Sequence, residues 1–338
     1  MTGPQLRPSI SVIIPCRNER DHIIPCINSV LESDYPDDKL ELIVVDGKST
    51  DQTIELISET FHSNQRIKLI TNEKQTTPFA LNLGIKHSTS EFIMILGAHS
   101  TISPNYIDTA IHHLMTDTTL GCAGGLLKSI ATTNSSGIIA TAMRSAFGVG
   151  NSHFRTGLQS GYVDTVAFGV YPRKVLDAVG YFDEELTRNQ DDEMSYRLIK
   201  SGYRIYLDHT ASATYYVRNS HAKLAGQQFQ YGYWKVYVNK KHKAITTLRQ
   251  LVPLFFLLYL ISIPIGVLFP VWFTPLFLYL LIAMIISMKH SRKLSDVLVL
   301  VFTFPVLHIS YGYGYLRGII DFIFLNKKHI QQHTQLTR

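Results

Sequence analysis

A run of 38 residues without a charged or histidine side chain constrains this chain more than any other feature. The run covers residues 251–288 and begins LVPLFFLLYLISIPIGVLF. A helix needs about 20 apolar residues to cross a bilayer, so this run suits two crossings and is far too long for one. Proline at 264, 270 and 275 favours a turn near Phe269. The sequence therefore predicts a membrane hairpin; the alternative, a buried helix pair in a soluble core, would need an unusually large protein around it.

The net charge of +6 is concentrated at the two ends of this run. Cytoplasmic flanks of membrane helices are rich in Lys and Arg, so the placement predicts a cytoplasmic side for both ends. We expect no nucleic-acid partner, because the sequence has neither a recognisable nucleic-acid module nor basic residues interleaved with aromatic ones. Three cysteines without a CxxC motif suit a reduced, cytosolic domain. The basic residues are Lys235, Lys240, Lys241, Lys243 and Arg249 before the run, and Lys289, Arg292 and Lys293 after it.

A third apolar segment, residues 294–326, allows two interpretations. It is long enough to span a membrane, but His308, Arg317 and Asp321 are costly in lipid. A span would also leave Lys327 on the outer side, against the charge rule. A re-entrant or interfacial segment, broken near GYGYLRG, fits better than a span.

The first hundred residues alternate between strand and helix patterns. Strand patterns in SISVII, LELIVVD, RIKLITN and EFIMIL are separated by helical stretches such as 21–32 and TPFALNLGIKHS. This order predicts an α/β fold with a doubly wound, mostly parallel sheet, whose ligands bind at the carboxyl ends of the strands. No GxGxxG follows the first strand, so the dinucleotide-binding fingerprint is absent.

The second half of the soluble region is less regular. Residues 129–160 are rich in Ser, Thr, Gly and Ala, which indicates a mobile crossover. YPRKVLDAVGYF and DDEMSYRLIKSG predict helices, and YRIYLD and ATYYVR predict two strands. The predicted organisation is a domain over 1–235, a basic juxtamembrane segment over 236–250, a membrane region over 251–326 and a polar tail over 327–338.

Four motifs occur in a fixed order: SVIIPCRNE, ELIVVDGKSTDQT, ILGAHST and RNQDDEMSYRL. Together they resemble glycosyltransferase family 2, which has the GT-A fold. The segment FGVYPRKVLDAVGYFDEEL is most similar to the membrane-associated exopolysaccharide branch, of the succinoglycan-biosynthesis kind. The resemblance covers about residues 9–235, and the apolar helices behind it fit the same branch.

The resemblance implies that a nucleotide sugar lies over the strand ends. Asp46 would accept the N3–H of a uracil ring, and Asn18 and Glu19 would lie near the ribose and base. Taken by itself, Asp46 could equally be a turn residue. The implied nucleotide-sugar site consists of Pro15, Asn18, Glu19, Asp46, Lys74, Gly97 and His99.

Asp191 stands where the family has its general base. Gln190 replaces the family's usual glutamate, so Asp192 or Glu193 would have to compensate for it. The alternative interpretation of these acids is simple stabilisation of a helix N-terminus.

Contacts to the acceptor or the diphosphate are expected from Asp192, Arg218, Gln230 and Trp234. For the segment QQFQYGYWK, an amphipathic interfacial helix is an equally good interpretation.

His99 falls at the metal-facing position, whereas Gly97 replaces the aspartate of the branch's Asp-Ala-His. A single imidazole ligand predicts weak binding of a divalent cation, with Mn²⁺ favoured over Mg²⁺. Loss of the metal, with His99 as a structural histidine, is the alternative.

The sequence thus predicts a multi-pass cell-membrane protein whose catalytic domain faces the cytoplasm. Its predicted activity is inverting transfer from a nucleotide sugar, UDP-linked, to a lipid-linked saccharide, with membrane lipid as a further partner. One rival is a polyprenyl-phosphate sugar synthase. Another is a non-catalytic binding or assembly subunit, which Gly97 and Gln190 favour and the retention of Asp46 and Asp191 opposes.

Overall fold

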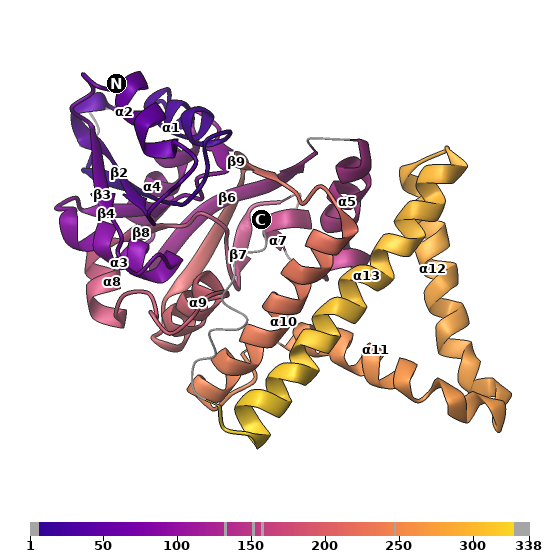
Figure 1. Cartoon of the computed structure of the whole chain (residues 1–338). Coiled ribbons are helices and arrows are strands. Elements are labelled where there is room, and N and C mark those ends of the chain that lie inside the picture. The colour runs from indigo at the N-terminus through magenta and orange to yellow at the C-terminus, as the bar shows by residue number, and fades with distance from the viewer. Residues whose placement is uncertain (1–6, 132–133, 151–152, 157–158, 247, 328–338) are drawn as a thin grey trace. The chain divides into compact units, whose positions relative to one another are not determined.

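The computed structural model contains two compact units, and each combines separate stretches of the chain. Unit 1 comprises Met1–Lys128 and His153–Tyr215, and unit 2 comprises Ser129–Ser152 and Tyr216–Arg338. The structure describes residues 7–131, 134–150, 153–156, 159–246 and 248–327 (Figure 1). The predicted polar tail lies almost wholly outside these residues.

Unit 1 contains a mixed sheet with the strand order β3-β2-β1-β4-β8-β6-β9-β5, and β7 pairs with β9. The first four strands in this order are parallel, as the alternating pattern predicts. β1, β2 and β4 are mostly buried and apolar, as strands covered on both faces must be, whereas β3 at the edge is partly exposed. These strands are β1 (Ile10–Cys16), β2 (Leu40–Asp46), β3 (Ile67–Thr71) and β4 (Phe92–Ile95).

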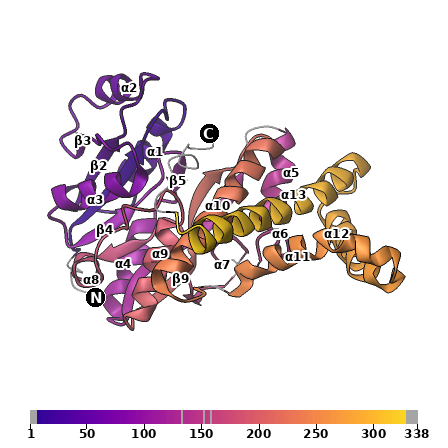
Figure 2. The same ribbon diagram turned by 60° about the horizontal axis from the view of Figure 1, so that its bottom comes forward.

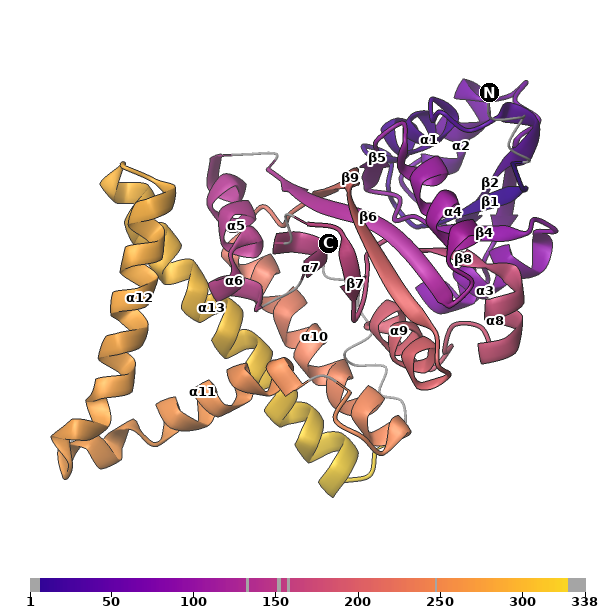
Figure 3. The ribbon, with the colours of Figure 1, turned by 180° about the vertical axis from the view of Figure 1, so that it is seen from behind.

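The other half of the sheet is antiparallel, since β8 reverses direction beside β4 and β5 pairs antiparallel with β9. The two strands expected in YRIYLD and ATYYVR are one continuous strand, β9, which runs beside the long strand β6 (Figure 3). These strands are β5 (Ser100–Ile102), β6 (Leu120–Ile130), β7 (Gly161–Val163), β8 (Val170–Pro172) and β9 (Arg204–Tyr216).

Helices pack on the sheet through an apolar core that contains Ile13, Ile43, Leu81, Leu176 and Met194. The core includes residues of β1, β2, α3, α8 and α9. Leu198 of α9 lies against β6 at Gly121. The helices of unit 1 are α1 (Ile23–Leu31), α2 (Thr53–Thr60), α3 (Thr77–His87), α4 (Tyr106–Thr116), α7 (His153–Thr156), α8 (Arg173–Val179) and α9 (Gln190–Lys200), with a 3₁₀ turn, η1 (Asp37–Lys39).

Unit 2 is helical in the residues that the structure describes. The crossover predicted at 129–160 contains the helices α5, α6 and α7 within the described residues. The helices of unit 2 are α5 (Asn134–Arg144), α6 (Ala146–Val149), α10 (His221–His242), η2 (Leu248–Leu251), α11 (Val252–Ile261), η3 (Ile263–Val267), η4 (Pro270–Phe273), α12 (Thr274–His290), α13 (Leu294–Gly318) and the π-helical η5 (Ile319–Phe324).

Glycines bring α10 and α13 into close contact, and the two helices run side by side (Figures 1 and 2). A Cβ atom at Gly314 would collide with the carbonyl of Phe229, and one at Gly232 with the carbonyl of Tyr311. Small residues allow helix backbones to approach in this way. The α-helix α13 continues through this glycine seam to Gly318, the last residue of GYGYLRG, and there changes to the π-helical η5, so the helix type changes where a break was expected.

Two helices are long and apolar enough to cross a membrane, judged by length and composition: Pro270–His290 and Leu294–Phe324. Leu248–Ile261 is apolar but shorter. The turn expected near Phe269 is present, where two 3₁₀ turns join α11 to α12.

Candidate active site

Asp46 ends β2, and its carboxylate is held by the loop that follows. The side chain is only 7% exposed. The backbone N–H of Ser49 donates to it at 3.1 Å, and the Ser49 hydroxyl donates at 2.5 Å. These bonds account for two of the four or so lone-pair directions of a carboxylate, so others remain for a ligand.

Asn18 joins the loop after β1 to the loop after β2. Its backbone N–H donates to the hydroxyl of Ser49 at 2.8 Å, and its side-chain oxygen accepts from the backbone N–H of Thr50 at 2.8 Å. Its φ of 55° is left-handed, a conformation that asparagine adopts more readily than most residues. Asn18 and Asp46 are therefore fixed relative to each other, as the parallel register of β1 and β2 requires.

Glu19 and His99 form a pair at the ends of β1 and β4. His99 Nδ1 lies 3.2 Å from Glu19 Oε1, and Glu19 is 4% exposed. A carboxylate in this position fixes the tautomer and orientation of an imidazole, as it does for many metal-bound histidines. A metal would then be coordinated through Nε2, which suits a weak site with one nitrogen ligand. No group of three potential metal ligands occurs within the described ranges.

The backbone at position 97 does not require glycine, because its φ is not in the left-handed region. The glycines with a left-handed φ in the described residues are Gly150, Gly180 and Gly202. A Cβ at position 97 would lie 3.2 Å from a ring carbon of Phe168 and 3.6 Å from the hydroxyl oxygen of Ser100. The buried hydroxyl of Ser100 has no hydrogen-bond partner. A Cβ at position 97 thus needs only a small movement of one aromatic ring.

Asp191 lies in the first turn of α9, at the surface of the unit, where neighbouring protein atoms crowd its carboxylate. Oδ1 accepts from the backbone N–H of Asp192 at 2.9 Å. Desolvation by the surrounding protein raises the pKa of Asp191 above its ordinary value, and the charge of Asp192 raises it further, whereas Arg155 opposes the shift. A carboxylate with a raised pKa is a stronger base while it remains ionised at neutral pH.

Glu193 cannot compensate for Gln190, which corrects one of the two options that the sequence left. Glu193 is 1% exposed and accepts from Arg197 Nε at 2.7 Å. Arg197 also donates to the carbonyls of Val179 and Gly180, so the pair anchors α9 to the end of α8. The side-chain oxygen of Gln190 is buried and has no hydrogen-bond partner.

Arg155, which sequence reasoning missed, lies between the two halves of this site. Its guanidinium carbon lies 5.5 Å from the ring centroid of Tyr215, and that ring meets the imidazole of His99 edge to face at 5.3 Å. Its charge also acts on Asp191. The signal in the sequence was slight, a single arginine after Phe154 in a stretch of small residues.

The remaining predicted residues are not gathered here. Lys74 is exposed on the turn after β3, and Pro15 is half-buried within β1. Arg218, Gln230 and Trp234 belong to unit 2. Trp234 is fully buried and packs against Tyr237 and Phe322, so its ring faces the interior of that unit.

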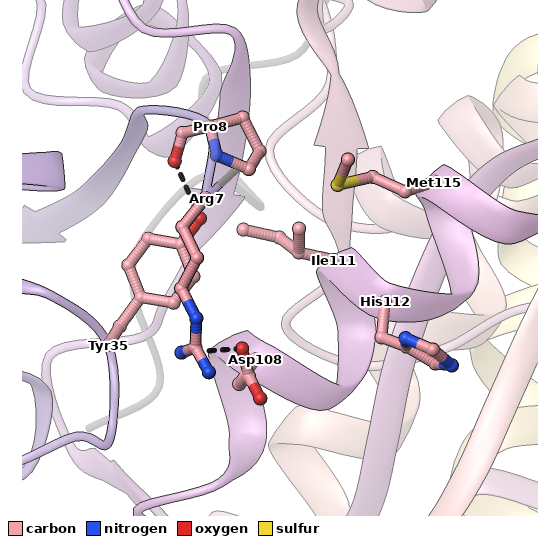
Figure 4. Close-up of a pocket in the computed structure, with 7 residues that line it drawn as sticks. All are labelled: Arg7, Pro8, Tyr35, Asp108, Ile111, His112 and Met115. Atoms are coloured by element: carbon pink, nitrogen blue, oxygen red, sulfur yellow. Dashed lines mark hydrogen bonds and ion pairs between the residues drawn. The ribbon is translucent and has the colours of Figure 1, made fainter. Parts of the chain in front are cut away.

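A small pocket elsewhere in unit 1 takes no part in this site. It lies between the start of the chain and α4, where Arg7 forms an ion pair with Asp108 and the hydroxyl of Tyr35 donates to the carbonyl of Pro8 (Figure 4). Its polar groups are paired with one another, which is consistent with packing of the N-terminal segment.

Comparisons with known proteins bear on the family and the fold of the chain. The profile of Glycosyl transferase family 2 matches residues 11–180, half of the chain. The chain is 31% identical, over 92% of its length and 97% of the relative's, to a dolichyl N-acetyl-alpha-D-glucosaminyl phosphate 3-beta-D-2,3-diacetamido-2,3-dideoxy-beta-D-glucuronosyltransferase of Methanococcus voltae. It is 30% identical to the succinoglycan biosynthesis protein ExoA of Rhizobium meliloti, over 72% of this chain and 74% of that protein.

Among solved structures, the mannosyltransferase PcManGT of Pyrobaculum calidifontis, in complex with GDP-Man and Mn²⁺, has a similar fold. The TM-score is 0.62 at 18% identity, and the match covers 94% of this chain and 88% of that one. This likeness confirms the GT-A-type α/β fold that the motifs predict. With the family profile and the two relatives, it shows that the chain is a glycosyltransferase and belongs to glycosyl transferase family 2.

Proposed function

We propose that this glycosyltransferase transfers a sugar from a UDP-sugar, with inversion, to a saccharide linked to a membrane lipid. The observation that carries the proposal is the fixed group of Asn18, Asp46 and the Glu19–His99 pair at the strand ends, next to which Arg155 stacks on the Tyr215 ring that meets His99. The charge of Arg155 also acts on Asp191.

In the proposed reaction Asp46 accepts the N3–H of uracil, and the Asn18 loop supports the ribose. Asp191 removes the proton from the acceptor hydroxyl as that oxygen forms a bond to the anomeric carbon. The bond from the anomeric carbon to the diphosphate oxygen breaks, and its electron pair leaves with UDP. His99 would hold a divalent cation, Mn²⁺ in preference to Mg²⁺, which supplies positive charge to the diphosphate.

A lipid-linked acceptor is supported by the Methanococcus voltae relative, whose name describes a dolichyl-phosphate-linked substrate and which matches this chain over nearly its whole length. The two long apolar helices of unit 2 support attachment to a membrane. Arg218 is proposed to contact the acceptor, whereas the burial of Gln230 and Trp234 argues against a direct contact from either side chain.

The donor is tested by incubating purified full-length protein with a panel of UDP-, GDP- and dTDP-sugars and measuring release of the nucleotide. Each donor is offered with a polyprenyl-phosphate-linked saccharide, with polyprenyl phosphate, or with no acceptor. Release that needs a UDP-sugar and the lipid-linked saccharide is the expected result. Activity with bare polyprenyl phosphate would make the protein a polyprenyl-phosphate sugar synthase. No turnover or binding with any donor would favour a non-catalytic assembly subunit.

The proposed orientation has the N-terminal domain and the loop at 289–293 in the cytoplasm and the turn near Pro270 outside. Single cysteines at Pro270 and Ser291 can be probed in intact cells with a membrane-impermeant thiol reagent. Background labelling of the native Cys26 and Cys122 should be low, because burial raises the pKa of both thiols to about 12. Labelling at 270 but not at 291 is expected, and the reverse pattern would overturn the orientation.

A further inference from the structure

The reaction needs more positive charge at the diphosphate than His99 can organise. The departing UDP gains negative charge as the glycosidic bond breaks, and fixed cations at that point lower the barrier most. Gly97 contributes no carboxylate to a metal, and within the described ranges no third metal ligand stands near His99. The site therefore calls for a cation supplied by the protein itself.

Arg155 has the contacts that such a cation needs. Its guanidinium lies over the ring of Tyr215 at 5.5 Å and over that of Phe154 at 5.3 Å. A stacked guanidinium keeps its N–H donors in the plane of the group, the geometry in which arginine binds phosphate. The half-buried position of Arg155 limits the screening of its charge by water.

The platform under Arg155 is also rigid on the His99 side. Tyr215 is 8% exposed and lies in β9, where it pairs with Ser100 of β5, the residue after His99. The Tyr215 ring contacts the imidazole, whose Nδ1 is held by Glu19. Arg155, Tyr215, His99 and Glu19 therefore form one connected row that ends at the position proposed for the diphosphate.

We infer that Arg155 binds the phosphate oxygens of the donor's diphosphate and neutralises the charge of the departing nucleotide. The inference rests on the proposed function. A phosphate group could also come from the lipid-linked acceptor, but the row that leads to His99 favours the donor. Because Arg155 also acts on Asp191, it is well placed to couple departure of UDP to activation of the acceptor hydroxyl.

The test compares Arg155→Gln with a matched control, Arg204→Gln, in the full-length protein. Arg204 also stacks on a tyrosine, Tyr162, but it pairs with Asp117 and has no part in the row described above. UDP, uridine and inorganic pyrophosphate are titrated calorimetrically, in the presence of Mn²⁺ and in excess chelator. R155Q should lower the affinity for UDP and for pyrophosphate by about tenfold or more, the size expected for lost hydrogen bonds to a charged group. Its affinity for uridine should be unchanged. R204Q should match the wild type.

Two further variants separate binding from folding. Arg155→Lys keeps the charge but loses the planar fork, so its loss of UDP affinity should be smaller than that of R155Q. Tyr215→Leu removes the ring on which Arg155 stacks, so it should lower the affinity for UDP more than the affinity for uridine. Equal binding of UDP by wild type and R155Q would overturn the inference, and so would an R155Q effect confined to the KM for the lipid-linked acceptor. A wild-type protein that binds UDP no better than uridine would refute the proposed donor as well, so the two failures are distinguishable.

Discussion

The nucleotide side of the site (Asn18, Glu19, Asp46 and His99) and the base side (Arg155, Gln190 and Asp191) are built differently. On the nucleotide side, side chains bond to backbone groups of neighbouring loops at the ends of parallel strands, as Asn18 does to Thr50. On the base side, Asp191 accepts from the backbone of its own helix, and the side-chain oxygen of Gln190 is buried without a partner.

This difference indicates how the two substrates are received. A buried polar group without a partner is costly, and a ligand that supplies the missing bond recovers that free energy. Under the proposed function, the nucleotide side is held ready for a nucleotide, and we infer that a bound acceptor would complete the base side. Loss of a nucleotide-side residue should therefore impair donor affinity, and loss of a base-side residue should impair turnover.

The largest expected effect is on the base side. Asp191→Asn should lower kcat by about 10² or more, the usual contribution of a general base, with little change in UDP affinity. Turnover with a lipid-linked acceptor and calorimetric binding of UDP measure the two quantities separately. Asp192→Asn serves as the neighbouring control and should have the smaller effect. Normal turnover of D191N would remove Asp191 from the mechanism.

The converse is expected on the nucleotide side. Asp46→Asn should weaken UDP-sugar binding by roughly tenfold or more, because a charged acceptor of the uracil N3–H is lost. The kcat at saturating donor should change little, and affinity for CDP, which lacks that N–H, should not fall. An equal loss for both nucleotides would show that Asp46 only supports its loop.

A third experiment changes the metal position without changing the fold. His99→Ala should remove most metal-dependent activity. Gly97→Asp should raise activity severalfold at limiting Mn²⁺, since the backbone accepts a side chain at position 97 and only the ring of Phe168 must shift. Activity is measured against Mn²⁺ and Mg²⁺ concentration for wild type and both variants, with a chelator control. Full wild-type turnover in excess chelator would make His99 a structural histidine.

The smallest expected effect concerns stability. The pKa of Asp191 is raised in the folded protein, so the ionised carboxylate disfavours folding at pH values above that pKa. Asp191→Asn should therefore unfold at the same or a slightly higher temperature at pH 7, even though its activity is lost. The gain should shrink as pH falls through the raised pKa and vanish below the ordinary value of about 3.9. A lower unfolding temperature at pH 7 would contradict this expectation.

The parallel half of the fold could be predicted from the sequence because its signals are local. Strand and helix periods alternate cleanly up to residue 96, and Asp46 stands at a strand end in the sequence as in the structure. The antiparallel half could not be predicted, because the reversal at β8 and the continuity of β9 depend on pairing between distant segments. Nothing in YRIYLDHTASATYY marks a single strand, since its polar centre also suits a turn.

The same distinction holds within the site. The pairing of Asn18 with the loop after β2 follows from two adjacent strand ends, and Asp191 follows from a helix start. Arg155 could not be found from the sequence, because its stacking partner, Tyr215, lies 60 residues later in the chain. The Tyr215 ring in turn contacts the imidazole of His99, the residue before β5. Glu193 was misjudged because its partner, Arg197, also caps α8, which spacing along one helix does not reveal.

The glycine seam between α10 and α13 has a consequence for synthesis of the chain. α10 ends at His242, but its partner does not end until Gly318, which is 76 residues later. At ribosomal rates of 5–20 residues per second, α10 waits roughly 4–15 s for the helix that covers Gly232 and the buried Gln230. During that interval the face of α10 that will become buried is open to chaperones, proteases and other nascent chains. Translation of α13 therefore ends the exposure of this face of α10.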